Sequence, residues 1–278
     1  QVTVALTGDS GDEVFCGYTR YSVGADLYDR FKSTPASLRY AIGTAAQLLS
    51  PSSYSYTLSI ISKLIPRLRK YKRFGDNVHK IARVIDFKDE ADLYRKLIST
   101  SSESYLTHEI QDIVTDIMEA FGCSDLHISE KMMWQDSVGY MRNDILTKVD
   151  RASMAVSLET RIPFLDNNVV EHAWSLPLAN KQFNGLSKSP LRDIVSDYVP
   201  DNIMNRPKAG FGIPIDSLLR NQLREWAEGL LSESALSKTG FIDVRKVRNV
   251  WRAHLSGKVN EQYSLWNILM FQQWNLNR

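Results

Sequence analysis

The amino-acid sequence predicts a mainly α-helical chain with a single clear β-strand at its N-terminus. Residues 2–6 (V-T-V-A-L) are small apolar or β-branched, a composition typical of a short strand buried on both faces. Most of the later sequence instead repeats apolar side chains every three or four residues, as amphipathic helices do. Almost no other segment has the composition of a strand. Because a buried parallel strand needs neighbours on its edges, we expect the chain to be part of a larger protein.

A turn rich in glycine and acidic residues follows the strand. Gly8 and Gly11 are expected where the backbone turns tightly, with Asp9 between them and Asp12 directly after. From about Asp12 a helix can begin, whose unpaired N-terminal amide groups are electropositive. Carboxylates at such a turn suggest a phosphate carried by Mg²⁺, because carboxylate and phosphate repel each other without a cation between them. A capped helix with solvated acids in its first turn is the structural alternative.

Composition and charge limit the kind of protein. The chain has 278 residues, of which 43% are hydrophobic and 24% charged, values ordinary for a soluble globular protein. The net charge of +2 gives no reason to expect a polyanionic partner. Cys16 and Cys123 cannot build a disulfide framework, so a reducing cytoplasm is the expected location. We expect no membrane span, because no apolar run reaches about 18 residues, and no signal peptide.

Helical periodicity predicts most of the remaining elements. The predicted helices cover residues 18–31, short pieces of 33–56, 76–99, 108–121, 215–231 and 244–255, followed by an aromatic stripe over 263–274 at core spacing. Residues 63–73 are basic with an interleaved tyrosine, which is compatible with nucleic-acid contact. In a nearly neutral chain, a solvated helix face is the favoured interpretation. The histidines have no metal-ligand spacing, so no zinc site is predicted.

Residues 6–18 carry the most specific motif. They read L-T-G-D-S-G-D-E-V-F-C-G-Y and resemble the S-G-[DE]-G-x-D-E-x-F-G-G-Y signature of the glutamine-dependent asparagine synthetases. Thr7 stands where that family usually has serine, and Cys16 where it usually has glycine. Neither departure removes a carboxylate.

A second block, residues 146–166, is similar to the family's L-x-K-x-D-R-x-S-M-A-x-S-L-E-x-R-x-P-F-L-D. Ile145, Val149 and Ala152 form an apolar stripe of a predicted helix, which Pro163 ends by about residue 162. Glu159 and Arg161 are expected to form a structural ion pair.

A third block combines K-S-P-L-R at residues 188–192 with R-P-K-A-G-F at 206–211, again similar to the family. Pro190 is tolerated only in a first helical turn, which places Lys188 at a helix start. A lysine is unfavourable there for the helix dipole, so its charge can serve another purpose. The resemblance implies that Lys188 faces an acyl-adenylate and that Lys208 lies near the phosphates.

The resemblance also implies a fold and a reaction. Residues 1–278 would be a partial synthetase domain: the C-terminal helical portion of an α/β PP-loop ATP pyrophosphatase (adenine nucleotide alpha hydrolase-like) domain. The family's glutaminase domain and S-G-G-x-D-S pyrophosphate loop are missing. The implied activity is a cytoplasmic ATP-dependent ligase, with ATP and Mg²⁺ as cofactors. Aspartate is activated as an acyl-adenylate and then amidated by glutamine-derived ammonia, giving asparagine, AMP and pyrophosphate.

The resemblance assigns a role to each candidate residue. Asp12 would hold Mg²⁺, Asp9 would orient or deprotonate ammonia, and Lys188 would stabilise charge on the α-phosphate. The expected site is completed by the nucleotide-binding residues Gly8, Gly11 and Lys208. The chain alone is expected to be inactive, because it lacks a glycine-rich loop whose amide groups converge on the phosphates.

Three alternatives stay open. A related amidotransferase acting on a sugar or another carboxylate, or closing a ring, would share these motifs. A non-catalytic helical interaction module is the second alternative, and an RNA-binding protein using residues 63–73 is the third. The favoured interpretation includes no nucleic acid and no membrane partner. A homodimer is a candidate assembly, because a second copy could pair with the first strand.

Overall fold

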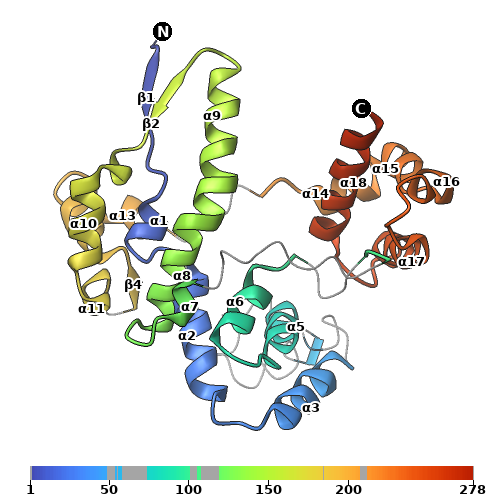
Figure 1. The fold of residues 1–278 in the computed structure, drawn as a ribbon, viewed down its shortest axis with the longest axis horizontal. Helices are drawn as coiled ribbons and strands as arrows, with labels where there is room; N and C mark the ends of the chain where they lie inside the picture. The colour runs from blue at the N-terminus through green and yellow to red at the C-terminus, as the bar shows by residue number, and fades with distance from the viewer. Residues whose placement is uncertain are drawn as a thin grey trace. The chain divides into compact units, whose positions relative to one another are not determined.

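A computed structural model describes residues 2–48, 54, 56–57, 74–100, 105–107, 119–183, 185–206 and 212–277. These residues are mainly helical, as the sequence predicts (Figure 1). The chain divides into two compact units. Unit 1 comprises residues 1–97 and 114–206, and unit 2 comprises residues 98–113 and 207–278. Each unit has a hydrophobic core of its own. The predicted basic segment 63–73 and most of the predicted helix 108–121 lie outside the described residues.

The N-terminal strand is present, but its surroundings differ from the prediction. Strand β1 (Val4–Leu6) pairs in parallel with β2 (Glu159–Arg161), and the two lie side by side in Figure 1. The expectation of an unpartnered strand is therefore wrong. Three residues of sequence E-T-R are too short and too polar to be recognised as a strand. Burial on both faces is also wrong, since Val4 is 39% and Leu6 is 72% exposed in a sheet of only two described strands.

Unit 1 is built from short helices around a main core, with a second, smaller hydrophobic cluster formed by Val14, Phe15 and Ala173. Its elements after β1 are α1 (Gly11–Val14), α2 (Thr19–Phe31), α3 (Ala36–Gln47), α5 (Phe74–Val84), α6 (Glu90–Ile98), α7 (Glu119–Gly122), α8 (Ile128–Asp136), the π-helix η3 (Ser137–Leu146) and α9 (Thr147–Met154). After β2 come the 3₁₀-helix η4 (Pro163–Leu165), α10 (Asn167–Ser175), α11 (Leu178–Lys181), β3 (Gln182–Phe183), β4 (Leu186–Ser187), α12 (Ser189–Ser196) and α13 (Asp201–Met204). Strands β3 and β4 form an antiparallel hairpin.

The helix predicted for residues 145–162 is only partly correct. The helical run α8–η3–α9 ends at Met154, and β2 follows before Pro163 is reached. No residue of α9 is buried, so the expected apolar stripe does not form a core face within the described part of the chain. The predicted ion pair is confirmed: Arg161 Nε lies 2.8 Å from Glu159 Oε1, on the strand β2 itself.

A buried carboxylate joins three helices of unit 1. Asp136, at the end of α8, is fully buried. It accepts hydrogen bonds from the Tyr21 hydroxyl at 2.6 Å, the Tyr94 hydroxyl at 2.7 Å and Arg20 Nε at 2.8 Å. Burial and the carboxylate raise the pKa of Tyr21. These contacts fix α2 and α6 against α8.

Unit 2 contains α14 (Ile215–Arg220), α15 (Arg224–Leu230), α16 (Glu233–Ser237), α17 (Val244–Leu255) and α18 (Gln262–Leu276). The helix predicted over residues 215–231 is thus divided at 221–223. Leu265 and Leu269 of the aromatic stripe are fully buried, and Trp266 packs against the same core. No helix among the described residues has the length and apolar character needed to cross a membrane.

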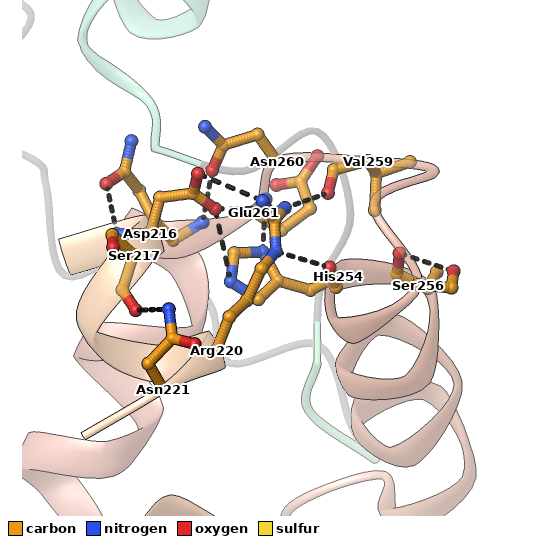
Figure 2. Close-up of polar contacts among 11 residues, drawn as sticks. Asp216, Ser217, Arg220, Asn221, His254, Ser256, Val259, Asn260 and Glu261 are labelled. Atoms are coloured by element: carbon orange, nitrogen blue, oxygen red, sulfur yellow. Dashed lines mark hydrogen bonds and ion pairs between the residues drawn. The ribbon is translucent and has the colours of Figure 1, made fainter. Parts of the chain in front are cut away.

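A polar cluster holds the helix ends of unit 2 together (Figure 2). His254 is fully buried, and its Nδ1 accepts a hydrogen bond of 3.3 Å from the Glu261 backbone amide. Its Nε2 faces Asp216 Oδ1 at 3.5 Å. Arg220 donates to the His254 carbonyl at 2.9 Å and pairs with Asp216 at 2.9 Å. Burial and the nearby Arg220 charge lower the pKa of His254, so the neutral ring is favoured.

Candidate functional site

The structure brings together two of the predicted site residues that lie far apart in the sequence. Lys188 Nζ lies 2.9 Å from Asp12 Oδ2. Asp12 belongs to α1, which begins just after the turn that follows β1, and Lys188 directly precedes α12. The Lys188 side chain remains 28% exposed and the Asp12 side chain 34% exposed, so the pair can be reached from solvent.

The predicted position of Lys188 is confirmed. It is the N-cap of α12, and Pro190 lies in the first turn of that helix. Its backbone is left-handed, with φ of 58° and ψ of 38°. A residue with a side chain pays about 1–2 kcal/mol for this conformation, and such strain is concentrated at functional sites. Lys188 therefore has a strained backbone conformation at the residue whose side chain contacts Asp12.

The turn after β1 is built differently from the prediction. Gly8 and Gly11 are not the left-handed residues of this turn; Ser10 is, with φ of 68°. A Cβ added at Gly8 would meet no described atom within 4 Å, whereas one at Gly11 would contact the Phe164 ring at 3.3 Å. Gly11 therefore permits close packing, and Gly8 leaves open space above the turn. The buried Ser10 Oγ has no hydrogen-bond partner among the described residues.

Asp9 has a separate environment. Its Oδ2 accepts a hydrogen bond of 2.9 Å from the Thr7 hydroxyl. Thr7 replaces the serine of the signature, but it keeps the hydroxyl group that makes this contact. Lys208, the remaining predicted site residue, lies outside the described residues.

Glu13 and Tyr18 also belong to the site region, and the sequence argument assigned neither a role. Glu13 is 1% exposed and accepts a hydrogen bond of 2.9 Å from the Tyr18 hydroxyl. Burial raises the pKa of Glu13, against the opposing effect of that hydrogen bond. The Arg20 guanidinium lies over the Tyr18 ring, 4.3 Å from the ring centroid. Because Arg20 pairs with Asp136 at 2.7 Å, the motif is linked to the core of unit 1.

The backbone conformation at position 16 explains why the signature has glycine there. The φ of Cys16 is 58°, in the left-handed region that glycine adopts most easily. The thiol is fully buried, accepts a hydrogen bond of 3.0 Å from Gln182 Nε2 and has its pKa raised to about 12 by burial. Cys16 is therefore a protonated core thiol and an unsuitable nucleophile at neutral pH.

The donor groups of the site limit the kind of metal that could bind. In the parts of the chain that the structure describes, no group of three or more His, Cys, Asp or Glu side chains could hold a metal ion. Asp12 offers one accessible carboxylate. Mg²⁺ usually keeps several waters and is bound through one or two carboxylates and substrate phosphates. The residues therefore fit a magnesium ion that arrives with a nucleotide.

Comparison with known proteins identifies the family of this chain. The relatives that cover nearly the whole chain include proteins named asparagine synthetase and one named amidase. The Asparagine synthase family model matches residues 1–276, and the chain belongs to this family. No solved structure matches the chain.

Three relatives illustrate the similarity. Asparagine synthetase [glutamine-hydrolyzing] 1 of Bacillus subtilis (strain 168) is 30% identical over 278 residues, covering 99% of this chain and 40% of that protein. A candidate asparagine synthetase [glutamine-hydrolyzing] of Mycobacterium tuberculosis (strain ATCC 25618 / H37Rv) is 30% identical over 276 residues, 99% of the chain and 39% of that protein. Amidase chry2 of Gibberella zeae is 24% identical over 276 residues, 95% of the chain and 39% of that protein. The chain thus spans about two fifths of the length of these relatives.

Proposed function

We propose that the chain is the C-terminal helical portion of the synthetase domain of an ATP-dependent, glutamine-hydrolysing asparagine synthetase. The domain would be of the α/β PP-loop ATP pyrophosphatase class. The observation that carries the proposal is the Asp12–Lys188 ion pair, which joins two signature motifs of the family in one accessible site. A solvated helix turn would not require a strained lysine from a distant helix start.

The proposed reaction has two steps. The side-chain carboxylate of aspartate attacks the α-phosphate of ATP, so that an acyl–phosphate bond forms and pyrophosphate leaves. Ammonia then attacks the acyl carbon, AMP leaves, and an amide bond is formed. Magnesium, when bound to the triphosphate, supplies charge neutralisation to the departing pyrophosphate. Ammonia would come from glutamine hydrolysed by a glutaminase domain outside this chain.

The roles of the charged residues follow from their chemistry. Asp12 offers a hard oxygen ligand that is one-third exposed, suited to a magnesium ion on pyrophosphate. Lys188 is a compact ammonium whose backbone is held at a helix start, suited to stabilising charge on the α-phosphate. Such electrostatic stabilisation is the main contribution of proteins to reactions at phosphorus.

Asp9 and the glycines complete the proposed site. One oxygen of Asp9 already accepts the Thr7 hydroxyl, which leaves further acceptor positions for the N–H groups of ammonia. The open space at Gly8 allows a ligand to approach the backbone, whereas Gly11 is in close contact with Phe164. Gly11 would therefore act through its backbone. Lys208 is proposed to contact the phosphates, by family resemblance alone.

A second candidate function has one specific observation in its favour. Similarity to Amidase chry2 extends over 95% of the chain, so the shared portion is also found in a protein with a different name. A related amidotransferase would use the same activation chemistry with another acceptor carboxylate. In that case Asp12 and Lys188 would keep their roles, because they act on the nucleotide.

Pyrophosphate release by the complete protein distinguishes these functions. With ATP, Mg²⁺ and glutamine present, aspartate should support release and form asparagine, whereas glutamate and sugar carboxylates should not. Release with a different carboxylate, and none with aspartate, would select the second candidate. Absence of release with every carboxylate tested would contradict both functions.

A further inference from the structure

Gly17 lies against both charged side chains of the site. A Cβ built on Gly17 would lie 2.1 Å from Asp12 Oδ1 and 2.2 Å from Lys188 Cε. It would also lie 2.8 Å from the Asp12 Cα, a backbone atom that cannot move aside easily. Real Cβ atoms essentially never approach another heavy atom closer than 3.0 Å. Only a residue without a side chain fits here while Asp12 and Lys188 remain in contact.

The requirement at Gly17 concerns space and not backbone conformation. The φ angle of Gly17 is not positive, unlike those of its neighbour Cys16 and of Lys188. Its amide donates a hydrogen bond of 2.7 Å to the Asp12 carbonyl, which holds its backbone close to α1. An added methyl group therefore could not be accommodated by a small shift of Gly17 away from Asp12.

The backbone of Lys188 is held in place at the start of α12. Its left-handed backbone caps α12, and its carbonyl accepts the Arg192 amide at 3.0 Å in the first turn of that helix. Pro190 further restricts the start of the helix. Only the side chain of Lys188 can therefore make room for a Cβ at Gly17, and moving its Cε, which would lie 2.2 Å from that Cβ, takes the neighbouring ammonium away from Asp12.

We propose that Gly17 is a positioning residue: by lacking a side chain, it leaves the space in which the Asp12 carboxylate and the Lys188 ammonium meet. The importance of Gly17 for catalysis rests on the proposed function, whereas its close approach to Asp12 and Lys188 does not. In the proposed reaction, Gly17 would set where both charges lie before the nucleotide binds.

Lysine acetylation followed by mass spectrometry tests this proposal on the 278-residue chain without any nucleotide. The measured quantity is the acetylation rate of Lys188 relative to Lys258, an exposed lysine of unit 2. Gly17→Ala should raise this ratio by about threefold or more, corresponding to loss of a partly exposed ion pair worth about 0.7 kcal/mol. Asp12→Asn should raise it to the same extent, because it removes the same partner.

Gly122→Ala is the matched control. Gly122 is also in unit 1, and a Cβ there would meet no described atom within 4 Å, so the ratio should not change. A rise with Asp12→Asn but not with Gly17→Ala would overturn the proposal. A rise with neither variant would also overturn it, because the ion pair would then not limit the acetylation rate of Lys188. Since no nucleotide is involved, these outcomes are independent of the pyrophosphate test.

A stability measurement covers the case in which Gly17→Ala weakens the fold. The shift of the urea midpoint caused by Gly17→Ala is compared in the wild-type chain and in an Asp12→Ala/Lys188→Ala background. The background removes two of the three atoms that the added Cβ would overlap, so the shift should fall by about half or more. Equal shifts in both backgrounds would show that Gly17 only supports the turn, and would contradict the proposal.

Discussion

Replacement of Asp136 by alanine should be among the most destabilising single changes in unit 1. The carboxylate is fully buried and is shared by Arg20 and the hydroxyl groups of Tyr21 and Tyr94. Loss of the ion pair should cost about 3 kcal/mol, near the low end for buried pairs, because the Arg20 side chain is 23% exposed and can regain water. Each tyrosine hydroxyl left without its acceptor should add about 1 kcal/mol. The expected total is about 5 kcal/mol.

Urea denaturation followed by circular dichroism measures this cost. Asp136→Asn keeps the shape and one acceptor oxygen but loses the charge, so it should cost about 2–3 kcal/mol. Asp29→Ala removes the exposed ion pair between Asp29 of α2 and Lys32, the C-cap of that helix, and it should leave the midpoint unchanged. An Asp136→Ala chain with a midpoint close to that of Asp29→Ala would refute the assignment of Asp136 as the link between three helices.

Two further predictions concern Lys188 and His254. In the complete protein, Lys188→Ala should lower acyl-adenylate formation by about 100-fold or more. Lys188→Arg should not restore it, because a planar guanidinium does not reproduce a compact ammonium in the space beside Gly17. Near-normal turnover of Lys188→Ala in a pyrophosphate assay would refute this role. His254 has its pKa lowered from 6.5 by burial, so the folded state binds fewer protons than the unfolded state, and stability should be lost as the pH falls below about 6.5. His254→Gln should reduce the change in urea midpoint between about pH 5 and pH 7, and an unchanged pH dependence would contradict the assigned environment.

Features with a local chemical cause could be predicted from the sequence. The strand β1 (Val4–Leu6) was indicated by the apolar and β-branched residues 2–6, and Pro190 was enough to place Lys188 at a helix start. The three motif blocks identified the family, which the comparison confirms. The contact between Asp12 and Lys188 agrees with the joint order of these blocks, although no local pattern gives its distance.

Features that depend on distant neighbours were not predicted. Strand β2 exists because β1 lies beside it, and its three polar residues carry no strand pattern of their own. In the sequence, nothing distinguishes Asp136 from other helical acids, because its hydrogen-bond partners lie on α2 and α6. Ser10 has a left-handed backbone between glycines that do not, so residue type alone misplaced the turn. The role of Gly17 likewise depends on a lysine from another segment.

We propose that Asp12 serves the nucleotide step of an asparagine synthetase. The most direct measurement compares pyrophosphate release and glutamine hydrolysis in the complete protein and in its Asp12→Asn variant. Asp12→Asn preserves the size of the side chain while removing the charge that pairs with Lys188. We expect that pyrophosphate release is abolished in Asp12→Asn while glutamine hydrolysis remains largely intact. Pyrophosphate release at the wild-type rate, or equal loss of both activities, would contradict it.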